Sequence, residues 1–181
     1  METKQLSFRK ASEIETETIK RHIKSYFGDS ALSSLFQKIL WVKEGKIREV
    51  YIMFSESAKT AEKITVEIYS AGIPIGSFHG DRFELEIEGA TLISPYTDKE
   101  IQIKTDQFLY GKPIFTENVI KYCEFKRGDY LIVRGKKNLL YGIGKAKINS
   151  NEIPLAQPNT ILIKEARKKR KDRGWYLREG D

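Results

Sequence analysis

Hydrophobic and polar positions in the first part of the chain recur at the spacing of helices. Ser12 with Glu15 three residues later has the form of a capping box, and the apolar residues that follow fall on one helical face. We predict that this helix ends near Gly28, since glycine is favoured where helices stop. Asp29 is placed to cap a second short helix, and a third is predicted over Ser55 to Ala61.

Short apolar runs separated by glycine and aspartate turns predict strands in the same half. They are Ile39 to Val42, Arg48 to Phe54, Val66 to Ser70, Ile73 to His79 and Phe83 to Ile93. Glu84, Glu86 and Glu88 alternate with apolar residues in the last run, so we expect their face to be a solvated edge or a protein-docking surface. The sequence therefore predicts an α+β domain over residues 1–97, with a mainly antiparallel sheet and helices on one side.

The second half follows a short boundary segment, Ser94-Pro95-Tyr96-Thr97-Asp98, and carries signals of a β-rich domain over residues 98–181. An apolar run ends at Gly111 and leads to a turn at Lys112-Pro113. Strands are predicted over Tyr130 to Val133 and over Leu139 to Lys147. The paired glycines Gly142 and Gly144 lie inside the second strand, which argues against a nucleotide-binding loop.

The excess positive charge lies entirely in this second half. Residues 101–181 hold 18 Lys and Arg against nine Asp and Glu, whereas residues 1–100 hold 14 against 16. Within the basic half, Lys164 to Arg178 has eight basic and two acidic residues. Such a block is either a solvated surface segment or a binding surface for a polyanion. The adjacent Trp175, Tyr176 and Leu177 resemble a terminal strand and favour a segment attached to a folded body.

The cluster offers contacts to the phosphates of RNA. The candidate residues are Arg167, Lys168, Lys169, Arg170, Lys171 and Arg173, together with Lys112. Lysine and arginine neutralise phosphates but carry little sequence information, so base recognition needs stacking platforms. The nearby candidates are Tyr110, Phe115, Trp175 and Tyr176, of which Phe115 and Trp175 are more typical of core residues. If the cluster is only a solvated face, the alternative RNA surface is formed by Lys126, Arg127, Arg134, Lys136 and Lys137.

Signals of catalysis, metal binding and membrane insertion are weak in this sequence. His22 and His79 lack a second ligand at metal-binding spacing, and Cys123 lacks a partnering base. No apolar run reaches the roughly 18 residues of a membrane span. We therefore expect a monomer that acts inside the cell without cofactor, metal or enzymatic activity.

Three segments of the second half resemble the PUA domain, a small β-barrel. They are LYGKPIF at Leu109 to Phe115, KRGDYLIV at Lys126 to Val133, and LLYGIGKA at Leu139 to Ala146. The resemblance implies a C-terminal β-barrel that binds RNA.

Three longer segments extend over nearly the whole chain: FRKASEIETETI at Phe8 to Ile19, the run from Tyr69 to Tyr96, and DQFLYGKPI at Asp106 to Ile114. Together they resemble the Nip-seven ribosome-biogenesis family. The resemblance implies a non-enzymatic factor that binds ribosomal RNA or its precursor, and contributes to rRNA processing, during assembly of the large ribosomal subunit. The short chain favours an archaeal, cytoplasmic member; a eukaryotic member would be nucleolar or nuclear.

Two other functions stay open from the sequence. One is an RNA-modification enzyme, or a subunit of one, whose PUA domain presents RNA to a catalytic N-terminal domain. The other is an adaptor whose N-terminal domain binds protein partners in ribosome assembly while the basic half tethers it to RNA.

Overall fold

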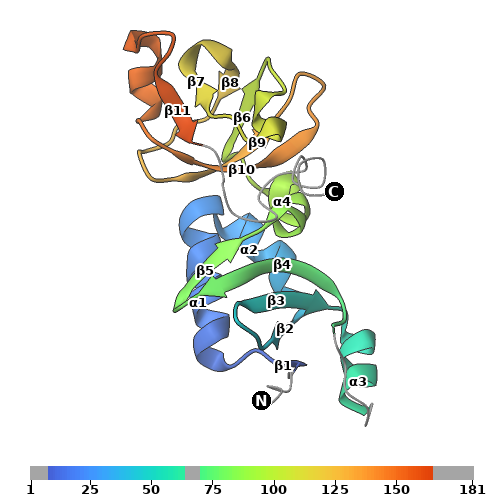
Figure 1. Ribbon diagram of the computed structural model, residues 1–181. Helices are drawn as coiled ribbons and strands as arrows, with labels where there is room; N and C mark the ends of the chain where they lie inside the picture. Colours follow the sequence, from blue (N-terminus) through green and yellow to red (C-terminus); the bar gives the residue numbers. More distant parts are fainter. Residues whose placement is uncertain (1–7, 64–69, 165–181) are drawn as a thin grey trace. The chain divides into compact units, whose positions relative to one another are not determined.

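The computed structural model describes residues 8–63 and 70–164, and the chain divides into two compact units between Pro95 and Tyr96 (Figure 1). Each unit has its own sheet. The strand predicted over Val66 to Ser70 lies outside the described residues except for Ser70. No helix in the described ranges is long and apolar enough to cross a bilayer.

The first unit is a five-stranded antiparallel meander with four helices. Its strands, in spatial and chain order, are β1 (Phe8–Lys10), β2 (Ile39–Lys43), β3 (Arg48–Met53), β4 (Ile73–His79) and β5 (Arg82–Leu85). Its helices are α1 (Glu13–Phe27), α2 (Asp29–Phe36), α3 (Ser55–Lys63) and α4 (Ile87–Ile93). Every neighbouring pair of strands in this sheet is antiparallel, which confirms the predicted fold class.

The helix boundaries follow the predicted capping signals closely. Ser12 and Glu15 form the expected reciprocal capping box of α1, and Gly28, with φ +90°, ends the helix. The same glycine precedes α2, so Asp29 is the first residue of that helix and not its side-chain cap. Gly28 is suited to this junction because a β-carbon disfavours positive φ.

The helices do not all lie on one side of the sheet, in contrast to the prediction. Ala58 and Ala61 of α3 pack in a cluster with Trp41, Tyr51 and Met53. Strand residues that alternate with these, such as Val42 and Val50, point to the opposite face and are fully buried. The sheet is therefore covered on both faces, because β2 and β3 present apolar side chains on both.

The prediction of one strand over Phe83 to Ile93 is wrong. The strand stops at Leu85, and α4 follows from Ile87. Glu86 precedes this helix and is buried, accepting a hydrogen bond of 2.8 Å from Ser77 Oγ. Gly89 allows α4 to approach β4, since a β-carbon there would lie 2.3 Å from the Ile75 carbonyl oxygen. The acidic alternation therefore forms no solvated strand face.

The second unit is a small six-stranded barrel. Its strands are β6 (Glu100–Ile103), β7 (Ile114–Phe115), β8 (Val119–Tyr122), β9 (Tyr130–Arg134), β10 (Leu140–Ala146) and β11 (Ile161–Lys164), and its short 3-10 turns are η2 (Gln107–Tyr110), η3 (Thr116–Asn118) and η4 (Ser150–Leu155). A further 3-10 turn, η1 (Ser94–Tyr96), spans the boundary between the units. The strand order is β7-β11-β10-β9-β6-β8. The edge strands β7 and β8 are joined by only the three residues of η3, so the sheet must curl until its edges meet.

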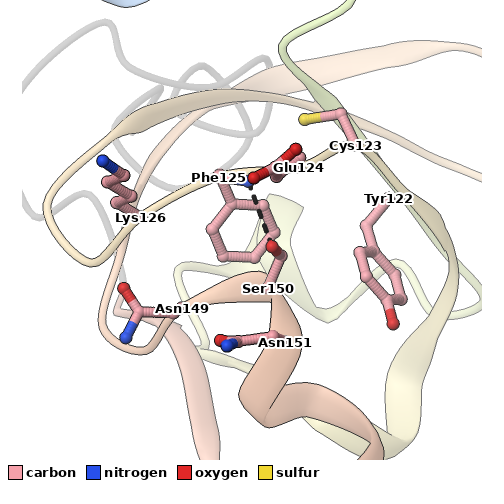
Figure 2. A pocket seen from close by; sticks show the side chains of 8 residues that line it. All are labelled: Tyr122, Cys123, Glu124, Phe125, Lys126, Asn149, Ser150 and Asn151. Carbon is pink, nitrogen blue, oxygen red and sulfur yellow. Dashed lines mark hydrogen bonds between the residues drawn. The ribbon is translucent and has the colours of Figure 1, made fainter.

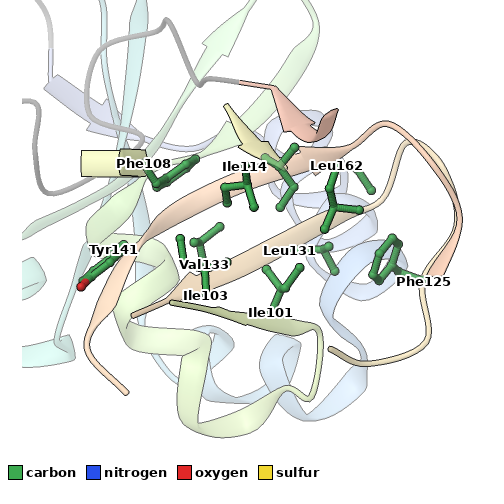
Figure 3. Packing of buried hydrophobic residues seen from close by; sticks show 11 residues of the cluster. Ile101, Ile103, Phe108, Ile114, Phe125, Leu131, Val133, Tyr141 and Leu162 are labelled. Atoms are coloured by element: carbon green, nitrogen blue, oxygen red, sulfur yellow. The ribbon is translucent and has the colours of Figure 1, made fainter. Parts of the chain in front are cut away.

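A continuous apolar core fills this barrel (Figure 3). Ile101, Ile103, Leu131 and Val133 are fully buried, and the core ends at Phe108 and Tyr141 on one side and at Phe125 on the other. Gly144 makes room for β11, because a β-carbon there would lie 2.2 Å from Ile163 Cγ2. Gly144, one of the two glycines predicted to lie within a strand, therefore serves packing.

A charged network fastens α1 of the first unit to its sheet. The carboxylate of Glu15 accepts hydrogen bonds from Arg9 at 2.8 and 3.0 Å and from Arg48 at 2.8 Å. Its side chain is 6% exposed. The Arg9 guanidinium lowers the pKa of Glu15 from 4.5 to about 2.

We predict that Glu15→Gln destabilises the first unit and alters its acid unfolding. A carboxyl with a lowered folded pKa stabilises the fold above its unfolded pKa, and this contribution is lost as pH falls from about 4.5 to 2. The variant should lose roughly 1 to 3 kcal/mol at neutral pH and show a flatter pH dependence in that window. Urea denaturation followed by circular dichroism at several pH values measures both effects.

Glu17→Gln is the matched control on the same helix, because Glu17 is 69% exposed and forms a surface ion pair with Lys20. It should change stability by less than about 0.5 kcal/mol. Equal effects of the two variants would contradict the role assigned to Glu15.

Candidate nucleic-acid interface

The turn η2 buries one aromatic side chain and exposes another. Phe108 is buried in the barrel core, whereas Tyr110 is 63% exposed and Lys112 is also exposed. Gly111 sits between them with φ +71°, and the amide groups of Gly111 and Lys112 donate to the carbonyls of Phe108 and Gln107, each at 3.1 Å. The turn therefore anchors itself through Phe108 and presents an aromatic ring and an ammonium group to solvent.

A side-chain hydrogen bond ties this turn to a distant hairpin. The Tyr141 hydroxyl donates to Asp106 Oδ1 at 2.5 Å, and this bond raises the pKa of Tyr141 to about 12. The Tyr141 ring lies directly over Gly135, where a β-carbon would be 2.1 Å from Cζ. Because Asp106 precedes η2 and Gly135 follows β9, the tyrosine holds η2 beside the β9–β10 hairpin.

That hairpin carries two exposed lysines. Lys136 and Lys137 lie at its tip, which the Gln102 side chain supports by donating to the carbonyl oxygens of Gly135 and Lys136, each at 3.2 Å. We define the Tyr110 surface as four of the exposed residues of the turn and hairpin: Tyr110, Lys112, Lys136 and Lys137. One aromatic ring and three cations thus share one end of the barrel.

The structure does not bring together all residues of the alternative RNA surface that the sequence predicted, namely Lys126, Arg127, Arg134, Lys136 and Lys137. Lys126 and Arg127 precede β9, whereas Lys136 and Lys137 follow it. At about 3.3 Å per residue, the five residues of β9 separate its ends by roughly 13 Å. Arg134 is 15% exposed and forms an ion pair of 2.6 Å with Glu100. The set is therefore split between two ends of the barrel, and Arg134 is already engaged.

The basic cluster from Arg167 to Arg173 lies outside the described residues. The preceding strand, β11, is antiparallel to β7, with Ile161 opposite Phe115 and Ile163 opposite Ile114. Since β7 begins two residues after Lys112, β11 runs in the direction of Lys112 as it approaches Lys164. The chain therefore heads toward the Tyr110 surface where the described part ends.

The side chains considered for catalysis, Cys123 and His22, lie in surroundings that differ from those of an activated nucleophile or a metal ligand. Burial raises the pKa of the Cys123 thiol, which favours its neutral form. The His22 ring lies against Tyr26 and Phe83, at centroid distances of 4.9 and 5.4 Å. Within residues 8–63 and 70–164, no three His, Cys, Asp or Glu side chains gather as metal ligands.

Family models match both units. Residues 8–87 match the NIP7/UPF0113 pre-PUA domain, and residues 101–181 match the UPF0113 PUA domain. The chain belongs to the NIP7/UPF0113 family. Among curated relatives of the family, it is 27% identical to a UPF0113 protein of Archaeoglobus fulgidus over 178 residues, covering 96% of this chain and 95% of the relative.

Solved archaeal structures share the fold of this NIP7/UPF0113 chain at low identity. A PUA-domain structure from Aeropyrum pernix K1, determined as a tartrate complex, gives a TM-score of 0.66 at 14% identity, covering 96% of this chain and 91% of that one. A conserved PUA domain protein from Thermoplasma acidophilum gives 0.60 at 15% identity, covering 90% and 96%. These likenesses confirm the PUA fold of the second unit.

We predict that Tyr141→Phe loosens the hairpin without unfolding the barrel. Losing the bond to Asp106 should cost about 1 kcal/mol, and the backbone amides of residues 135–139 should exchange faster with solvent. In the parent, the contribution of the bond is present below pH 10 and is lost as pH rises toward 12, because the folded pKa is raised. Hydrogen exchange with mass spectrometry measures the hairpin directly.

Tyr110→Phe serves as the control, because Tyr110 is exposed and its hydroxyl supports no described element. Unchanged exchange at the hairpin in Tyr141→Phe would show that the hydroxyl does not hold the hairpin in place.

Proposed function

We propose that this chain is an RNA-binding ribosome-biogenesis factor. It binds ribosomal RNA or its precursor through the PUA domain during large-subunit assembly and rRNA processing. The observation that carries the proposal is the Tyr110 surface: the hydrogen bond between Tyr141 and Asp106 joins the turn that exposes Tyr110 and Lys112 to the hairpin that exposes Lys136 and Lys137. Membership of the NIP7/UPF0113 family supports it.

The chemistry of the surface suits single-stranded RNA. Lys112, Lys136 and Lys137 neutralise phosphates and release condensed counterions, which gives affinity that falls with salt. Tyr110 offers a ring on which one base stacks. Phosphate contacts position the strand, and the stacked base contributes preference.

The C-terminal basic cluster extends this surface in our proposal. Its residues Arg167, Lys168, Lys169, Arg170, Lys171 and Arg173 add phosphate contacts. The direction of β11 toward Lys112 supports this arrangement.

The proposed role is binding without catalysis. An RNA-modifying enzyme needs an activated nucleophile or base, whereas burial favours the neutral thiol at Cys123. We propose that the protein acts as a monomer without cofactor or metal, and that the first unit binds protein partners during assembly. The archaeal source of the relative from Archaeoglobus fulgidus supports an archaeal, cytoplasmic role.

We predict that replacing Lys112, Lys136 and Lys137 together by glutamine weakens RNA binding and flattens its salt dependence. For single strands, the slope of log affinity against log salt should fall by roughly 0.7 for each phosphate that the variant no longer neutralises. Fluorescence anisotropy with a labelled single-stranded RNA at several salt concentrations measures the slope. All RNA sequences should be affected about equally.

The control variant replaces Lys46, Lys59 and Lys63 by glutamine; these lysines are exposed on the first unit, so the same charge is removed. If the two variants lose RNA affinity equally, the loss depends on the net charge of the protein and not on the position of the lysines, which would contradict the proposed surface. Tyr110→Ala should instead cost about 1 to 3 kcal/mol and change base preference more than the salt slope.

A further inference from the structure

A pocket lies at the other end of the barrel from the Tyr110 surface. It is an open pocket of about 490 Å³. Its lining residues are Tyr122, Cys123, Glu124, Phe125, Lys126, Asn149, Ser150 and Asn151 (Figure 2). Figure 3 places Phe125 at the opposite end of the apolar core from Phe108 and Tyr141. The proposed function does not use this pocket.

Hydrogen bonds between two loops form the pocket without a ligand. The Phe125 amide donates to Ser150 Oγ at 3.2 Å, and the Ser150 amide donates to the Phe125 carbonyl at 3.0 Å. The Arg127 amide donates to Asn149 Oδ1 at 2.9 Å. The loop before β9 is thereby clamped to the start of η4, so a ligand would meet a preformed site.

The walls of the pocket combine an aromatic ring with carboxamides. Tyr122 is 37% exposed and packs edge-on against the buried Phe125, with ring centroids 6.3 Å apart. Asn149 Oδ1 is occupied by the Arg127 amide, which leaves its Nδ2 to donate to another group. Asn151 is exposed and supplies one donor group and one acceptor. Figure 2 shows Tyr122 on one side, Asn149 and Lys126 on the other, and Asn151 below Ser150.

The rim of the pocket carries cations, and two carboxylates near them accept hydrogen bonds from backbone amides. Lys126 and Arg127 are exposed. Asp129 accepts the Lys126 amide at 2.9 Å, and Glu152 accepts the Asn149 amide at 2.8 Å. Glu124 is the exposed carboxylate among the lining residues. Among the described residues the Lys126 ammonium group forms no ion pair, so it can contact a phosphate at the edge of the pocket.

We propose that this pocket binds one unpaired nucleobase of single-stranded RNA. The base stacks on Tyr122, its hydrogen-bonding edge meets the carboxamides of Asn149 and Asn151, and its phosphate meets Lys126. A nucleotide is the chemical class that combines a planar face, an edge of donors and acceptors, and an anion, and these three match the ring, the amides and the cation. The inference rests on the proposed RNA-binding function and adds a second, base-reading contact to it.

Titration of the full-length, isotope-labelled chain with nucleoside 5′-monophosphates tests the site by NMR. AMP, CMP, GMP and UMP are added separately, with inorganic phosphate as the reference. The side-chain amide signals of Asn149 and Asn151 should shift with at least one nucleotide and stay in place with phosphate. If phosphate alone shifts them equally, or if no nucleotide shifts them, the pocket is not a nucleobase site.

Variants then separate this site from the Tyr110 surface. Asn151→Ala and Tyr122→Leu should each weaken binding of single-stranded RNA about tenfold, with the salt slope unchanged, because stacking and amide contacts release no counterions. Asn159→Ala, an exposed asparagine outside the pocket, is the control and should bind as the parent does. If Tyr122→Leu fails to fold, the Asn151→Ala variant alone tests the pocket, because Asn151 is exposed and its replacement should leave the fold intact.

The outcomes distinguish the inference from the function on which it rests. If both pocket variants bind RNA as tightly as the parent while the triple lysine variant loses affinity, the pocket takes no base and the RNA-binding function stands. If the parent itself binds no RNA, both proposals are wrong.

Discussion

Closure of the barrel decides where every candidate group in the second unit can lie. β7 and β8 occupy the two edges of a six-stranded sheet, yet only η3 separates them in the chain. The sheet must therefore close, which gives it two ends with different chemistry. Phe108 closes the core at one end and Phe125 at the other (Figure 3). Residues that are close in sequence on either side of β9 consequently face different surroundings.

The Tyr110 surface depends on one polar contact across that barrel. Asp106 and Tyr141 are 35 positions apart, and their hydrogen bond joins η2 to the β9–β10 hairpin. Without it, Tyr110 and the hairpin lysines would sit on two independent loops. Holding them in place lowers the conformational entropy that is lost when an RNA strand orders them, which favours binding.

Local signals make much of the fold predictable from the sequence. The capping box of Ser12 and Glu15, the turn at Gly28 and the hairpins act over a few residues, so their patterns specify the structure directly. The segment after Leu85 is not predictable in this way, because the buried Glu86 accepts a hydrogen bond from Ser77 on the distant strand β4. Period-two alternation there cannot reveal that interaction. The candidate site was predictable only in part, for the same reason. Tyr110 and Lys112 are recognisable from the turn that they share, whereas no local pattern predicts that the hairpin with Lys136 is joined to the turn that follows Asp106.

Ultraviolet crosslinking of the protein in its own cells, followed by sequencing of the attached RNA, tests the central claim most directly. The account predicts crosslinks concentrated on large-subunit ribosomal RNA or its precursor, with crosslinked peptides from the PUA domain. Crosslinks spread over messenger and transfer RNA without enrichment of ribosomal RNA, or crosslinked peptides confined to the first unit, would contradict it.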